Sequence, residues 1–283
     1  MSNPSSNDSA FNGGPKGELD AYAPKTIAKR VLDIGVKKTH YPAYKTLTLG
    51  LMGGAFISFG ALYELSVMAH PDTNDSAATI VAPFFYAFGY IMAFISGAEV
   101  FTTNNLSAMG VASGKLRLLE VARNWSLVLV ANLVGATFIA LLYSFSGLPE
   151  EMDLAVIQMA KSLAAEKLAY GPVEFVIIGT FGNMLICSGL WLAMAGRTVT
   201  DKVLALLVPV AAVPALSFQH STGNVFQFVL ALITEAEGVP LDLPSEITIG
   251  AIASNLFFVS IGNIIGGGVF IAVIYYFVFL RGA

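Results

Sequence analysis

Apolar stretches long enough to cross a lipid bilayer recur along nearly the whole of this 283-residue chain. A helix needs about 20 predominantly apolar residues to span the hydrocarbon layer. Charged residues make up only 12% of the chain, about half of the ~25% that is typical of soluble domains. The sequence therefore predicts an all-α integral membrane protein with six transmembrane helices near Thr46–Met68, Ala77–Phe101, Val121–Phe145, Pro172–Ala195, Val203–Ile233 and Ile247–Leu280.

The chain before the first span differs from the rest. Residues 1–22 are rich in Ser, Asn, Gly and Pro, which predicts a disordered N-terminal tail. Residues 23–283 make up the predicted six-span domain. It begins with Ile27, Val31 and Ile34 at helical spacing and with basic residues between them. This pattern is typical of an amphipathic helix, which lies either on the membrane surface or against the protein itself.

Basic residues are divided unevenly between the two sides of the predicted spans. Of the 15 Lys and Arg residues, only Lys161 and Lys167 fall on the side opposite the chain ends. Short loops rich in Lys and Arg stay in the cytoplasm. We therefore expect a multi-pass protein of the cell inner (cytoplasmic) membrane with both termini in the cytoplasm, as six spans require.

Polar residues interrupt the second and the fifth span. His220 lies within Leu216–Phe226, and Ser96–Asn105 occupies the corresponding place in the first half of the chain. Lipid cannot hydrogen-bond an interrupted backbone, so such a break survives where it lines a cavity or a pathway. An ionisable residue at this depth indicates a functional site. Three spans per half, each half with a broken middle span, predict two inverted three-helix repeats around a transport pathway.

Each break also creates a new helix N-terminus, whose partial positive charge favours an anion or a polar neutral solute over a bare cation. Four hydroxyl side chains at the breaks are the expected caps: Thr102, Thr103, Ser221 and Thr222. Three other residues are candidates for hydrogen bonds between helices: Asn132, Asn183 and Asn263. The pairs Gly50–Gly54 and Gly262–Gly266 predict close helix contacts, either within a protomer or between protomers.

The sequence contains no motif that indicates an enzyme, such as His-Glu-x-x-His, Gly-x-Ser-x-Gly or a Gly-rich nucleotide loop. Of its three histidines only His220 lies deep in a span, so a metal site would lack ligands. We therefore predict no enzyme activity, no cofactor, no metal and no nucleic-acid partner. An aquaporin-like neutral-solute channel remains an alternative, although neither break contains the Asn-Pro-Ala turn of that family.

Several motifs together resemble the formate/nitrite transporter family, over roughly Ala23 to Arg281. They are Gly97-Ala-Glu-Val-Phe-Thr-Thr103, Arg123-Asn-Trp125, Asn132-Leu-Val-Gly135, Phe181-Gly-Asn-Met-Leu-Ile-Cys187, Trp191-Leu-Ala193, Phe218-Gln-His-Ser221 with Asn224, and Ile261-Gly-Asn-Ile-Ile-Gly-Gly-Gly268. The resemblance implies a homopentamer of anion channels in the membrane lipid, in which each aquaporin-like, six-helix protomer has its own pore.

The resemblance also implies roles for single residues. His220 corresponds to the pore histidine, and Asn183 and Asn224 to its polar surroundings. Thr102 falls in a mobile loop. The remaining implied positions are two residues where the pore narrows beside that loop, one constriction residue and one vestibule lysine: Val100, Phe101, Tyr90 and Lys167. Glu174 follows this lysine by seven residues, so Lys167 either pairs with that carboxylate or lies free to attract anions.

Two departures from the family's pattern bear on the substrate. Gln219 stands where a glutamate commonly precedes the histidine, and Tyr90 adds a hydroxyl at a position that is usually aliphatic. We expect a channel or transporter for a small monovalent anion. Formate is the first expectation, and nitrite, hydrosulfide and short monocarboxylates are the alternatives. The sequence leaves open whether passage is passive or is coupled to protons through His220.

Overall fold

The computed structural model describes residues 20–70, 75–148, 154–235 and 246–282, and every regular element in these ranges is helical. Most of the tail predicted at residues 1–22 lies outside the described residues. The elements are α1 (Pro24–Thr39), α2 (Ala43–Met68), α3 (Asp75–Ser96), α4 (Phe101–Asn104), the 3-10 turn η1 (Asn105–Ser107), α5 (Ala108–Ala112), α6 (Leu118–Ser144), α8 (Ala155–Leu168), α9 (Pro172–Ala195), α10 (Val199–Ala215), α11 (Ser221–Glu235), α12 (Ile249–Asn263), the π-helical stretch η2 (Ile264–Val273) and α13 (Ile274–Phe279).

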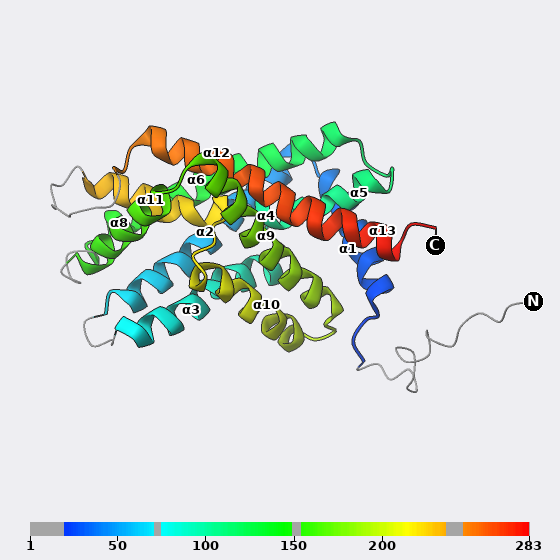
Figure 1. The fold of residues 1–283 in the computed structure, drawn as a ribbon, viewed down its shortest axis with the longest axis horizontal. Coiled ribbons are helices and arrows are strands. Elements are labelled where there is room, and N and C mark those ends of the chain that lie inside the picture. Colours follow the sequence, from blue (N-terminus) through cyan, green and yellow to red (C-terminus); the bar gives the residue numbers. More distant parts are fainter. Residues whose placement is uncertain (1–19, 71–74, 149–153, 236–245, 283) are drawn as a thin grey trace, which may run out of the picture.

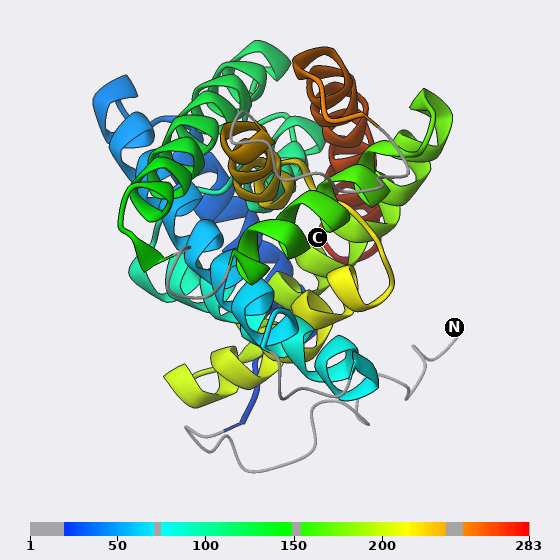
Figure 2. The same ribbon diagram turned by 90° about the vertical axis from the view of Figure 1, so that its left-hand side faces the viewer.

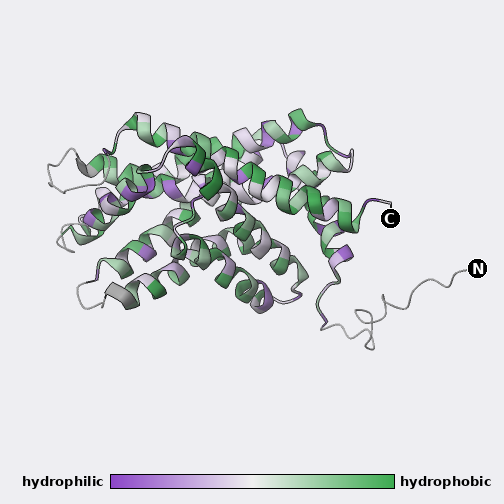
Figure 3. Ribbon diagram, in the orientation of Figure 1, coloured by the Kyte–Doolittle hydropathy of each residue, from purple (hydrophilic) through white to green (hydrophobic). Residues whose placement is uncertain are grey.

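Five helical segments of the described chain are long and apolar enough to cross a membrane. They are Ala43–Met68, Ala77–Ser96, Leu118–Ser144, Pro172–Ala195 and Ile249–Phe279, the last of which combines α12, η2 and α13. Hydrophobic residues dominate these long helices in Figure 3. The expected fifth span, Val203–Ile233, falls on two shorter helices, α10 and α11. α8 is not among the helices predicted from the sequence and occupies the expected connection between the third and fourth spans.

The helices form one elongated bundle. α2 packs against α3 and α6, α9 packs against α10 and α12, and α11 contacts both α6 and α8. In Figure 1, α1, α5 and α13 lie at one end of the bundle and α8 lies at the other. Figure 2 views the molecule from the end where α8 lies.

Small residues allow the closest helix contacts. A Cβ atom added at Gly54 would overlap with the backbone oxygen of Asn132, and one added at Gly266 would overlap with that of Thr180. The predicted close contacts therefore join helices within one chain. α1 also uses its apolar side within the chain, since Ile27 and Val31 are part of the buried core. The apolar side of this helix therefore packs against the protein.

Helical structure stops at both predicted interruptions. α3 ends at Ser96, where Gly97 has a φ of 81°. Glycine adopts this left-handed conformation without the steric penalty of a side chain. α10 ends at Ala215, and Ser217 has a φ of 56°. New helices begin at Phe101 and Ser221, so each interruption presents a helix N-terminus inside the bundle.

Candidate functional site

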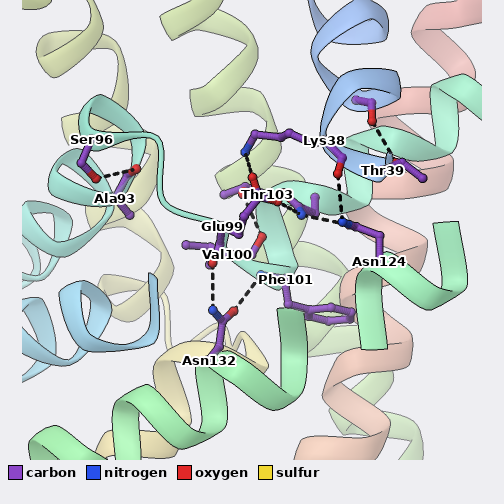
Figure 4. Close-up of polar contacts among 12 residues, drawn as sticks. Lys38, Thr39, Ala93, Ser96, Glu99, Val100, Phe101, Thr103, Asn124 and Asn132 are labelled. Carbon is purple, nitrogen blue, oxygen red and sulfur yellow. Dashed lines mark hydrogen bonds and ion pairs between the residues drawn. The ribbon is translucent and has the colours of Figure 1, made fainter. Parts of the chain in front are cut away.

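Asn132 forms hydrogen bonds with backbone groups at the interruption between α3 and α4 (Figure 4). Its side-chain oxygen accepts a hydrogen bond from the backbone N–H of Phe101 at 2.8 Å. Its amide nitrogen donates to the backbone oxygens of Gly50 at 2.7 Å and Glu99 at 2.8 Å. This one buried amide therefore satisfies backbone groups on both sides of the break, which the low-dielectric interior would otherwise leave unpaired.

Asn263 makes the corresponding contacts at the interruption between α10 and α11. Its side-chain oxygen accepts from the backbone N–H of Ser221 at 3.0 Å. Its amide nitrogen donates to the backbone oxygens of Gly179 at 2.8 Å and Gln219 at 3.3 Å. The first N–H groups of α4 and α11 are thus capped by asparagines from other helices. The expectation that hydroxyl side chains at the breaks cap these N–H groups is therefore wrong; those side chains are Thr102, Thr103, Ser221 and Thr222.

His220, Tyr90 and Thr102 meet at the centre of the bundle, where each is at most 3% exposed. The Tyr90 hydroxyl lies 2.9 Å from Oγ1 of Thr102 and 3.1 Å from Nδ1 of His220. The Tyr86 hydroxyl, one helical turn earlier on α3, contacts Nε2 of the same imidazole. Both interruptions thus contribute to one polar cluster, and two tyrosines of α3 join them.

The hydrogen bonds around His220 fix its protonation pattern. The backbone N–H of Gly223 donates to Nδ1 at 3.0 Å. Because a backbone N–H only donates, Nδ1 is the unprotonated nitrogen. A neutral imidazole then carries its hydrogen on Nε2, which faces the Tyr86 hydroxyl. The ring therefore presents one acceptor and one donor to the centre of the bundle.

A cavity of about 370 Å³ reaches this cluster from the end where α1 and α13 lie. We call it the Lys38 cavity. Tyr90 and Val100 form part of its lining, together with the cationic side chains of Arg30, Lys38 and Lys202, and its described lining contains no Asp or Glu. Lys38 forms an ion pair at 3.0 Å with Glu99, whose side chain is fully buried behind the lining (Figure 4). The positive charges of Arg30 and Lys202, to which no lining carboxylate is opposed in the described residues, make the cavity suited to anions.

A second cavity, of about 560 Å³, lies beside α8 and reaches Gln219, the residue before His220. We call it the Lys167 cavity. Lys167 is the only Lys or Arg in its described lining, and Glu64 and Glu166 contribute carboxylates. Burial lowers the pKa of Lys167 to about 8, and these two carboxylates act in the opposite direction.

Lys167 does not pair with Glu174 in the described structure. Its ammonium donates to the side-chain oxygen of Gln227 on α11. The Glu174 carboxylate instead accepts from the backbone N–H of Gly171 at 2.6 Å and caps α9. Of the two alternatives for Lys167, the described structure does not have the pairing with Glu174, because helix capping already engages that glutamate.

Gln219 is held by a network of amides. Its nitrogen donates to the backbone oxygen of Lys167 at 3.1 Å. Its oxygen accepts from the side chains of Asn224 and Asn255, both at 2.8 Å. A deprotonated glutamate has no hydrogen to donate to the Lys167 carbonyl. The neutral amide therefore fits this position, and the network explains the departure at Gln219.

The other predicted site residues lie around the cluster. Asn183 donates to the backbone oxygens of Thr102 at 3.1 Å and Asn263 at 2.7 Å, so it ties the first interruption to α12. Val100 lines the Lys38 cavity. Phe101 is 2% exposed and begins α4. Asn183, Phe101 and Asn224 are buried residues that line neither cavity.

Sequence reasoning missed Glu64 and the backbone-bridging role of Asn132 and Asn263. Glu64 gave a usable signal, since it is the only charged residue between Thr46 and Met68 and a carboxylate inside a span indicates function. The two asparagines gave a weaker signal, because the partners of a buried amide depend on the tertiary fold.

Comparisons with known proteins identify the family of this chain. The formate/nitrite transporter family model matches residues 25–277. The chain is 31% identical to the uncharacterized transporter YrhG of Bacillus subtilis, over 89% of this chain and 92% of that protein. It is 29% identical to the formate channel FocA of Escherichia coli, over 93% of this chain and 96% of FocA.

A solved structure described as a pentameric formate channel with formate bound superposes with a TM-score of 0.74 at 28% identity, over 84% of this chain and 98% of that one. The resemblance noted in the sequence is thus confirmed over most of the chain. The protein belongs to the formate/nitrite transporter family.

Proposed function

We propose that the protein is a membrane channel or transporter for small monovalent anions, with formate as its principal substrate. The pathway runs from the Lys167 cavity, past His220, to the Lys38 cavity. The observation that carries this proposal is the placement of His220 between residues of the two cavities. Tyr90, which contacts the imidazole, lines the Lys38 cavity, and Gln219, its chain neighbour, lines the Lys167 cavity.

The pathway is proposed to lie between two inverted three-helix repeats, in six spans of which the second and fifth are broken, as in an aquaporin-like protomer. The paired roles of Asn132 and Asn263 support this arrangement. Each asparagine lies on the third span of its half, accepts from the first N–H of the new helix and donates to the first span of its half. Such correspondence is expected of related repeats.

The Lys38 cavity is proposed to face the cytoplasm of a cell whose inner membrane holds the protein. Two observations support this orientation. α1 and α13 lie at the same end of the bundle as α5 (Figure 1). The basic residues of the chain ends and of the α5–α6 connection then fall together on the cytoplasmic side. The Lys167 cavity faces outward, and both termini are cytoplasmic.

The proposed mechanism solves the problem of moving a charge through a dry centre. Lys167 on one side and the cations around Lys38 on the other attract the anion into the cavities. A bare anion at the centre loses several kcal/mol or more of solvation. The Nε2 hydrogen of His220 offers a hydrogen bond there. The imidazole passes a proton from cavity water to the anion and returns to its neutral form, so that the solute crosses as the neutral acid. The acid releases the proton on the other side.

The protein is further proposed to assemble as a homopentamer with one pathway in each protomer. The solved relative described as a pentameric formate channel supports this proposal. Nitrite and hydrosulfide are the alternative substrates, since both are small monovalent anions. A neutral-solute channel is the remaining alternative, because Tyr86, Tyr90 and Thr102 line the centre with hydroxyl groups.

Flux through proteoliposomes tests the proposal. Purified protein is reconstituted, and uptake of formate, nitrite, hydrosulfide and lactate is compared across pH, alongside water and glycerol. Protein-free liposomes correct for direct diffusion of the neutral acids. We expect formate to move fastest and water and glycerol to stay at background. Fast glycerol flux without formate flux would support the neutral-solute alternative and contradict the proposal.

A further inference from the structure

Glu64 is a carboxylate in an unusual place. It lies on α2, is 4% exposed and borders the Lys167 cavity. Among the described residues, no hydrogen bond and no ion pair within 4.0 Å reaches its oxygens. A buried carboxylate normally finds a hydrogen-bond donor or a cation, because an isolated charge at such a site is strongly disfavoured.

Glu99, a second buried carboxylate in the described part of the chain, shows the contrast. Glu99 is fully buried, pairs with Lys38 at 3.0 Å and accepts a hydrogen bond from Asn104. Its charge is therefore neutralised by protein groups. Within the described ranges, Glu64 has no such direct partner. It borders the cavity that also holds Lys167, so an ion that enters the cavity interacts with its charge.

The groups that face Glu64 come from several helices. α8 contributes Glu166 and Lys167, and Tyr170 follows it in the lining. α3 contributes Thr79 to the lining. The amides of Gln219 and Gln227 complete the polar lining. One ammonium and two carboxylates thus share one cavity, and the ammonium already donates to Gln227.

This charge set opposes the binding of an anion. An anion held by Lys167 also meets the negative charge of Glu64 inside a cavity whose walls lower the local dielectric. Two like charges in a shared site are not both stable, and protonation of one relieves the repulsion. The anion and a proton on Glu64 therefore favour each other's binding, and this coupling is reciprocal.

We propose that Glu64 is the proton-binding group of the Lys167 cavity and that it takes up one proton for each anion bound beside Lys167. The carboxylate gains a proton from the water of that cavity and forms one O–H bond, and it returns the proton when the anion moves on. The net charge of the cavity is then the same before and after an anion binds. This inference rests on the proposed function, since it concerns the anion that the pathway carries.

The absence of a charge at Gln219 gives Glu64 this role. Gln219 is neutral and fully engaged by Lys167, Asn224 and Asn255. Glu166 is exposed, so water screens its charge. Among the described carboxylates of the cavity, Glu64 alone is both buried and unpartnered.

The first test is infrared difference spectroscopy of the purified full-length protein on addition of formate at neutral pH. Uptake of a proton by a carboxylate produces a new carboxylic-acid C=O band. We expect this band in the wild type and in Glu166→Gln, which is the matched control from the same cavity, and we expect its loss in Glu64→Gln. A wild type that binds formate without such a band contradicts the inference.

The second test is the pH dependence of formate affinity and flux in proteoliposomes. In the wild type, apparent affinity should fall by up to about tenfold per pH unit over the range in which Glu64 gives up its proton. Glu64→Gln should keep its affinity within about twofold over that range. Glu64→Asp and Glu166→Gln should both keep a pH-dependent step, because each variant keeps a titrating carboxyl group at position 64.

The outcomes separate the two proposals. If the wild type carries formate and assembled Glu64→Gln shows the same pH profile, the channel assignment stands and the role of Glu64 is overturned. No flux of formate or any other small anion in the wild type overturns both. If Glu64→Gln fails to assemble, the carboxylic-acid band of the wild type and the pH dependence of formate affinity in Glu64→Asp still test the role of Glu64.

Discussion

The backbone N–H of Gly223 donates to Nδ1 of His220 at 3.0 Å and fixes the imidazole in the neutral form with its hydrogen on Nε2. This contact sets which ring nitrogen acts as the donor at the centre of the bundle. It also requires a residue without a side chain at position 223, because a Cβ there would overlap with both the His220 ring and the Tyr86 hydroxyl.

Gly223→Ala should therefore displace His220 and reduce formate flux by more than tenfold. We expect a loss of about 1–3 kcal/mol of stability as well, as for overpacked interiors. Gly250→Ala is the matched control, because the nearest atom to its added Cβ is Thr248 Oγ1 at 4.0 Å. Thermal unfolding and flux measured on both variants check the prediction. Equal behaviour of the two would show that the ring tolerates a side chain at position 223.

Asn132→Ala and Asn263→Ala should each destabilise the protein by about 1–3 kcal/mol, because each leaves buried backbone N–H and C=O groups unpaired. The two losses should be similar, since the asparagines have corresponding partners. Asn105→Ala is the control, because both polar atoms of this buried side chain lack a hydrogen-bond partner in the described structure. A stability loss in Asn105→Ala as large as in the other two would refute the role assigned to their hydrogen bonds.

The sequence was sufficient for the helical membrane class and the places where helices stop, because apolar length and polar interruptions are local properties. The family resemblance also implied that His220, Tyr90 and Thr102 belong to the pathway, and the structure brings them together at the centre of the bundle. The sequence left the partner of Lys167 open, and the structure places the Gln227 side chain, 60 residues away, at its ammonium, whereas Glu174 is only seven residues away. The partner of a flexible ammonium depends on which helices meet, and no pattern in the chain specifies that.

The role of Lys167 can be measured through salt and pH. Lys167→Gln should weaken formate uptake most at low ionic strength, because salt screens the attraction of a charged vestibule. A lysine is charged below its pKa, and burial lowers that of Lys167 to about 8. The advantage of the wild type over Lys167→Gln should therefore shrink between pH 7 and pH 9.

Lys167→Arg is the matched control for this prediction. Its guanidinium stays charged throughout the same pH range, so its advantage over Lys167→Gln should persist at pH 9. Normal uptake by Lys167→Gln at low salt would remove the lysine from the mechanism. A salt-independent defect with lowered thermal stability would instead assign it a structural role beside Gln227.

Native mass spectrometry of the detergent-solubilised protein should give a homopentamer. The lipid-facing helices expose many large apolar side chains, such as Phe138 on α6 and Phe257 on α12, and assembly would cover part of this surface. A monomer or a tetramer as the only stable species would argue against the pentamer and favour an aquaporin-like assembly.

The central claim is that His220 links anion passage to protons, and one comparison tests it most directly. Formate uptake into proteoliposomes is measured from acidic to neutral external pH for the wild type and for His220→Asn, which keeps a hydrogen-bond donor but does not titrate. The account predicts that the variant assembles but loses the uptake that the wild type shows at acidic pH. Unchanged pH-dependent uptake in the assembled variant would contradict it.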